Sequence, residues 1–81
     1  MTYYQKTMKS IWDNNKLKSS REKADYNVKN ASDLLNITPE YLSMLENGHR
    51  KPSEMLIQRM STLYKQPITY FLREQKNIVT T

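Results

Sequence analysis

The chain contains a junction between two helical segments that leaves almost no room for a loop. Asn27 is suited to an N-cap, and apolar residues at helical spacing follow it as far as Leu35. Asn36 can end this helix, because asparagine tolerates the left-handed conformation. Thr38 and Pro39 then supply an N-cap and a first helical residue for the next helix. Two helices that follow one another this closely must cross at a steep angle.

The rest of the chain has the same periodicity, and the alternation typical of strands is not sustained. We therefore expect an all-α protein. A first helix ends at the Asn14-Asn15 pair, a short one runs from about Lys16 to Ala24, Ser53 caps a later helix, and Pro67 opens a last turn. These signals predict a compact five-helix domain at residues 16–72, a helical extension at 1–15 and a polar tail at 73–81.

Helical spacing also assigns a face to each side chain around the junction. In the helix before it, the predicted inner face consists of Val28, Ala31, Leu34 and Leu35. In the helix after it, Leu42 and Leu45 face inward with Tyr41 beside them, and the opposite face carries Glu40, Ser43, Met44 and Asn47. Gly48, the only glycine, follows this second helix at the position where glycine most often ends one.

Length and composition exclude several functional classes. A chain of 81 residues buries too little surface for a deep catalytic cleft. With no cysteine and one histidine, it cannot form disulfides or a thiolate or histidine metal site, and no nucleophile-base pair or phosphate loop is present. We therefore expect a protein that is not an enzyme, that has no catalytic residue, metal or cofactor, and that is cytoplasmic with no membrane partner. A net charge of +5 favours an anionic partner such as nucleic acid.

The stretch from Leu17 to Leu72 resembles the helix-turn-helix domain of phage lambda repressor and Cro and their bacterial relatives, the Xre family. The resemblance rests on "LKSSREKADYNVKNASDLLNI", "TPEYLSMLENGHRKPS" and "LYKQPITYFL", of which "ENG" followed by basic residues and "PS" is the most specific part. It implies a lambda-repressor-like fold that binds double-stranded DNA. The helix that begins at Val28 would lie across the DNA backbone, and the helix that begins at Pro39 would enter the major groove.

The resemblance also implies roles for individual residues. The residues expected to face the bases are Thr38, Pro39, Glu40, Ser43 and Met44, with Tyr41 at the flank. The residues expected to contact phosphates are Lys29, Asn30, Asn47, Arg50 and Lys51. In this family the acid before "NG" pairs with an arginine of the first domain helix, which implies a structural ion pair between Glu46 and Arg21.

The chain departs from the family at three positions of the expected interface. Val28 stands where a phosphate-binding glutamine is common, Pro39 where a glutamine or arginine reaches a base, and Met44 where a polar residue is usual. Glu40 can accept a hydrogen bond from cytosine N4 but repels phosphates. Such a face would recognise DNA largely through thymine methyl groups and DNA shape.

Two functions fit these observations. The first is a sequence-specific, repressor-like transcriptional regulator of bacterial, phage or mobile-element origin, acting as a homodimer on a two-fold operator. The second is a protein-binding module on the same fold, an antirepressor or antitoxin-type partner, whose altered face has turned to a protein. The stripe of Tyr4, Met8, Ile11 and Trp12 either packs on the domain or binds a second copy, and the other candidate dimer surface is the group of Tyr70, Phe71 and Leu72.

Overall fold

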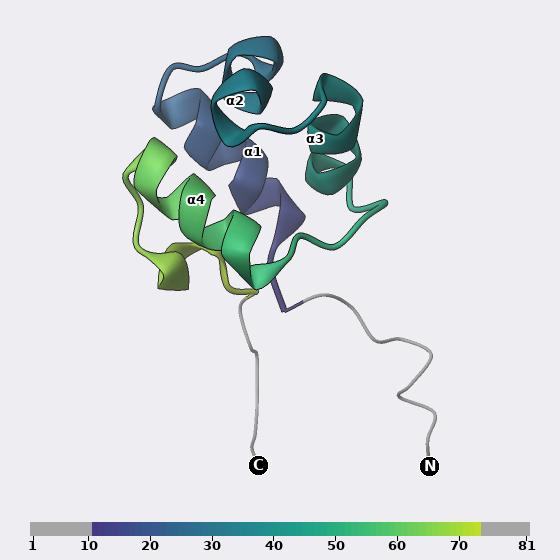
Figure 1. The fold of residues 1–81 in the computed structure, drawn as a ribbon. Coiled ribbons are helices and arrows are strands. Elements are labelled where there is room, and N and C mark those ends of the chain that lie inside the picture. Colours follow the sequence, from purple (N-terminus) through teal and green to yellow (C-terminus); the bar gives the residue numbers. More distant parts are fainter. Residues whose placement is uncertain (1–10, 74–81) are drawn as a thin grey trace, which may run out of the picture.

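The computed structural model describes residues 11–73, which form four α-helices and one short 3-10 turn, η2 (Figure 1). Their bounds are α1 (Asn14–Lys23), α2 (Val28–Leu35), α3 (Pro39–Glu46), α4 (Glu54–Tyr64) and η2 (Ile68–Phe71). The all-α prediction is confirmed. Within the described residues, no helix is long and apolar enough to cross a membrane.

The predicted fifth helix was wrong, because the chain forms only the single turn η2 at this place. Lys65 ends α4 in the left-handed conformation, and Pro67 on one side and Leu72 on the other are extended. Four residues remain between them, too few for a repeating pattern of α-helical hydrogen bonds. The Tyr70 N–H donates to the Pro67 carbonyl (2.9 Å), a bond that spans three residues.

Each α-helix begins with a side chain that accepts a hydrogen bond from a backbone N–H of the first turn. The predicted caps Asn27, Thr38 and Ser53 are confirmed in α2, α3 and α4. In α1 this role belongs to Asp13, which accepts from the Asn15 N–H (3.0 Å). The Asn14-Asn15 pair therefore lies in the first turn of α1, and the prediction that it ends an earlier helix was wrong. Each such cap stabilises its helix by about 1 kcal/mol.

The two ends of the described chain are paired with each other. The Asp13 N–H donates to the Phe71 carbonyl and the Arg73 N–H to the Ile11 carbonyl, both at 2.7 Å, which sets Trp12 opposite Leu72 in an antiparallel bridge. Figure 1 shows this pairing below the helices, where both ends of the coloured ribbon meet. Tyr4 and Met8, predicted to share a stripe with Ile11 and Trp12, lie outside the described residues.

The core takes side chains from every helix and from η2. Its buried members are Leu17, Ala31, Leu35, Leu42, Leu45, Leu56, Ile57, Met60, Tyr64 and Phe71. One predicted inner residue, Leu34, is instead 60 % exposed, so that assignment was wrong. In this eight-residue helix Ala31 and Leu35 already fill the core side one turn apart, which turns Leu34 toward the edge.

A buried ion pair joins α1 to α3, as the resemblance implied. The Arg21 guanidinium donates to both carboxylate oxygens of Glu46, at 2.7 Å and 3.0 Å, and its remaining terminal nitrogen donates to the Tyr26 carbonyl at 2.9 Å. Arg21 is 6 % exposed and Glu46 7 %. The hydrogen bond to Glu46 raises the pKa of Arg21 above its already high ordinary value, so Arg21 stays charged at every accessible pH.

Glu46→Gln should lower the free energy of unfolding by about 3 to 5 kcal/mol, because it leaves the Arg21 charge buried without a counter-ion. Urea titration followed by circular dichroism measures this change. Asp33→Asn is the matched control, since the Lys29–Asp33 pair (3.2 Å) is exposed and contributes less than about 1 kcal/mol. Equal losses in both variants would contradict this account of the buried pair.

Tyr64 is 2 % exposed, and its hydroxyl finds no hydrogen-bond partner among residues 11–73. Burial, and after it the nearby Glu46 charge, raise the pKa of Tyr64. The unfolded chain ionises Tyr64 near pH 10 whereas the folded chain keeps it neutral, so this group lowers the free energy of unfolding as the pH rises above about 10 and has no such effect below it.

Tyr64→Phe should raise the free energy of unfolding by about 1 kcal/mol at neutral pH and reduce its decline above about pH 10. Denaturant titrations at several pH values test both effects. Tyr70→Phe serves as the comparison, because the Tyr70 hydroxyl is hydrogen-bonded with Ser19 and Lys23, which lowers the pKa of that phenol, and its removal should destabilise the protein. A loss of stability in Tyr64→Phe would mean that the hydroxyl is satisfied.

Candidate nucleic-acid interface

The junction between α2 and α3 consists of Asn36, Ile37 and Thr38. Asn36 is left-handed (φ 62°, ψ 44°), and the Ile37 N–H donates to the Ser32 carbonyl (3.0 Å) to close the end of α2. Thr38 is extended, and its hydroxyl oxygen accepts from the Tyr41 N–H (3.1 Å) while Pro39 opens the helix. These local bonds direct α3 away from α2, at one side of the molecule (Figure 1).

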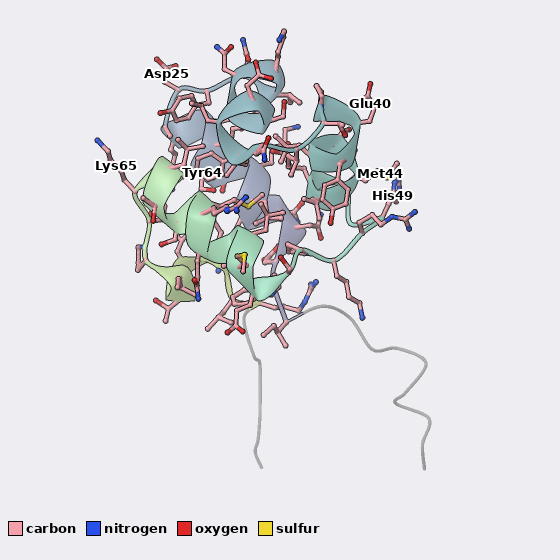
Figure 2. All side chains as sticks on the ribbon, in the orientation of Figure 1. Asp25, Glu40, Met44, His49, Tyr64 and Lys65 are labelled. Carbon is pink, nitrogen blue, oxygen red and sulfur yellow. The ribbon has the colours of Figure 1, made fainter. Side chains whose placement is uncertain are left out.

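One face of α3 is open to solvent over its whole length. Leu42 and Leu45 are fully buried, so the predicted inward face is confirmed. The residues predicted to share the opposite face are all exposed: Glu40, Ser43, Met44 and Asn47. Thr38 and Pro39 are exposed at the beginning of the helix. Figure 2 shows the labelled Glu40, Met44 and His49 along the outer side of α3 and the loop after it.

Tyr41 differs from the other expected base-facing residues. Its side chain is half-buried and packs against the core. It also lines a small cavity with Ile37 and Leu56, on the side of α3 that faces α4. The exposed face of α3 is therefore formed without the Tyr41 ring.

The exposed face of α3 combines few charges with several hydrogen-bonding groups. Glu40 places a carboxylate in the first turn, where its negative charge also interacts favourably with the positive end of the helix dipole. The Ser43 hydroxyl oxygen accepts from the Asn47 amide (3.3 Å), which leaves its own proton free to donate. Met44, 38 % exposed, adds an apolar thioether that can contact a methyl group.

Gly48 ends α3 and sets the direction of the following loop. Its φ of +81° is left-handed, its N–H donates to the Leu45 carbonyl, and the His49 N–H donates to the Met44 carbonyl (2.8 Å). These two bonds form a Schellman motif, so the predicted role of Gly48 is confirmed. His49, Arg50 and Lys51 follow directly and are exposed, and none of the three forms an ion pair within residues 11–73.

The two expected phosphate-contacting residues of α2 lie near its beginning. Lys29 and Asn30 are both exposed in the first turn. The Lys29 ammonium group lies 3.2 Å from the Asp33 carboxylate, which reduces its field toward an anion, whereas Arg50 and Lys51 have no such partner in the part of the chain that the structure describes. The stronger positive end of the candidate interface is therefore the loop after Gly48.

Asn14 positions the end of α3, and sequence analysis missed it. Its side-chain amide donates to the Glu46 carbonyl (2.9 Å), the last carbonyl of the helix. A Cβ on Gly48 would lie 3.3 Å from the Asn14 side-chain oxygen, so the two residues are in close contact. Because Asn14 and Glu46 are 32 residues apart, no local pattern in the sequence signals this bond.

Comparison with known proteins agrees with this geometry. The family model described as helix-turn-helix matches residues 17–71, from the first core leucine to the last core residue of η2. No curated protein and no solved structure matches the chain. A match over this range covers α2, α3 and α4 completely and α1 from Leu17 onward. The chain therefore belongs to the helix-turn-helix family of the lambda repressor and Cro type.

Proposed function

We propose that the protein is a repressor-like transcriptional regulator that places α3 in the major groove of double-stranded DNA. The observation that carries the proposal is the position of the exposed face of α3 between two basic ends, Lys29 on α2 and the loop from His49 to Lys51. The family consists of DNA-binding regulators, which supports the general class. The base contacts, the repressor activity and the bacterial, phage or mobile-element origin go beyond the family match and belong to the proposal alone.

Base recognition rests on three side chains of α3. Glu40 accepts a hydrogen bond from cytosine N4, Ser43 donates to or accepts from a base edge, and Met44 contacts a thymine methyl group. Thr38 and Pro39, exposed at the beginning of the helix, contribute close packing against the edge of the groove. Because no arginine, lysine or glutamine lies on this face, DNA shape contributes to the choice of site.

Phosphate binding supplies the position on the DNA and much of the affinity. Arg50 and Lys51 hold one phosphate strand beside the end of α3, together with Asn47. Lys29 and Asn30 approach the other strand from the first turn of α2. Val28 is half-buried and adds no polar contact, so the loop after Gly48 carries more of the affinity.

We further propose that two copies bind a two-fold operator, since one such domain makes few base contacts. Phe71 was predicted to belong to the C-terminal dimer surface, and this was wrong because Phe71 is fully buried in the core. Trp12, predicted for the N-terminal surface, is half-buried against the core. The apolar side chains left exposed beside the paired chain ends are Ile11, Ile68 and Leu72, and these are the contact residues that we propose for the dimer.

Replacing Arg50 and Lys51 together by glutamine should weaken binding to operator and random DNA by similar factors. The slope of log K against log salt should fall by about one unit for each lost phosphate contact. Fluorescence anisotropy over a series of salt concentrations measures both quantities. Lys65→Gln, which removes a charge at the end of α4, is the control and should change neither. An unchanged slope in the double variant, or a slope near zero in the wild type, would favour the protein-binding alternative.

Ser43→Ala and Met44→Ala should each change the base preferred at one or two operator positions. We expect a difference of about 1 to 3 kcal/mol against the correct base, with little change in melting temperature, because both side chains are exposed. Selection of bound fragments from random DNA with wild type and variants measures the preference. Leu45→Ala is the contrasting variant, since it should lower stability and leave the preferred sequence the same. The reverse pattern would mean that the wrong face of α3 had been assigned to DNA.

A further inference from the structure

We propose that the groove between α2 and α4 is a docking site for an amphipathic helix of another protein, one that carries an acidic residue beside its apolar face. The groove is separate from the exposed face of α3, and the proposal does not depend on DNA binding. Figure 1 shows that α2 and α4 are neighbours and that the chain passes from the end of α2 into the junction with α3.

The groove has a volume of about 700 Å³ and lies between the C-terminal half of α2 and the outer side of α4. A smaller cavity of about 190 Å³, which shares Met55 and Arg59 with it, continues toward Ile37 and Tyr41. Together they follow α4 from Ser53 to Leu63, a length of roughly 15 Å at the rise of an α-helix. This length accommodates the apolar anchors that a helix presents at positions i, i+3 or i+4, and i+7.

Large apolar side chains alternate with the polar Asn36, Gln58 and Thr62 along the groove. Its buried apolar residue is Leu35, and that of the smaller cavity is Leu56; both belong to the core. The walls include Leu34, 60 % exposed, and Met55, 64 % exposed, two of the most exposed large apolar side chains in the described chain. Two such residues on facing helices, over an apolar floor, form a surface that is stabilised when a partner covers it.

Arg59 is the one charged residue among the described groove residues, and its charge specifies the partner. The guanidinium donates a single hydrogen bond, to the Leu35 carbonyl at the end of α2 (3.4 Å), and forms no ion pair within residues 11–73. That bond holds it at the edge of the groove with other N–H donors free. A carboxylate on the partner would pair with these donors in bidentate geometry.

Shape and charge argue against a second copy of this chain in the same groove. In a two-fold contact centred on the groove, the groove would face its own equivalent, so two concave surfaces would meet and leave their floors unfilled. The same symmetry would bring Arg59 toward its equivalent, and like charges repel. A convex partner with acidic flanks avoids both problems.

The test uses a displayed library of helical peptides against the full chain. Each peptide has apolar anchors at i, i+3 or i+4, and i+7, and either Glu or Lys at the flanking positions. We expect enriched peptides to carry Glu, and Leu34→Ser or Met55→Ser to weaken their binding at least tenfold. Arg59→Glu should reverse the preference from Glu to Lys. Lys65→Glu is the matched control for Arg59→Glu, because it reverses a charge at the end of α4 but lies outside the groove, and binding should not change.

Three results would overturn the proposal. One is the absence of enriched peptides, or enrichment that persists in Leu34→Ser and Met55→Ser with melting temperatures like that of wild type. Another is sedimentation of the free protein as a dimer that Met55→Ser dissociates, which would assign the groove to a second copy. The third is tighter peptide binding after Ile78→Ser and Val79→Ser in the full chain, which would assign it to the chain's own C-terminal segment.

Discussion

The arrangement of this small domain depends on how the last residue of α3 is held. The Glu46 carboxylate binds the buried guanidinium of Arg21, and the Glu46 carbonyl accepts a hydrogen bond from Asn14. Both donors belong to α1, one near each end of that helix. Because α3 has eight residues, it would be marginal as an isolated helix and owes its stability to such contacts and to the burial of Leu42 and Leu45.

The same bonds also position the candidate interface. Glu46 is followed at once by Asn47 and Gly48, so a fixed Glu46 also fixes where the Schellman turn begins and where the basic loop leaves the helix. An ion pair that contributes little net stability over an apolar pair still excludes other arrangements, because either charge alone would be buried without a partner. We infer that the pair acts here mainly through orientation, since it sets the angle of α3 relative to α1.

Local signals were enough to predict the helix junction, the caps of α2, α3 and α4, and the turn at Gly48, because each depends on residues within five positions of one another. The inward face of α3 followed from spacing alone. Contacts distant in sequence were not predictable from local patterns, and the Arg21–Glu46 pair was expected only because of the family resemblance. Trp12 pairs with Leu72 and Asn14 with Glu46 only after the fold has formed. In a helix of eight residues, the packing of the neighbouring helices decides whether a side chain at the edge of the apolar face is buried or exposed. This explains why Leu34 was misassigned and why Tyr41 is half-buried.

Affinity and specificity occupy different parts of the proposed DNA-binding surface. The bases would meet a face whose only charge is the carboxylate of Glu40, whereas the free cations, Arg50 and Lys51, lie beyond the end of the helix. Substitutions on the exposed face can therefore change the preferred sequence without removing the charge that attracts DNA. The half-buried Val28 would strengthen this separation, because it leaves the beginning of α2 without one polar contact and would shift more of the proposed binding to the loop after Gly48.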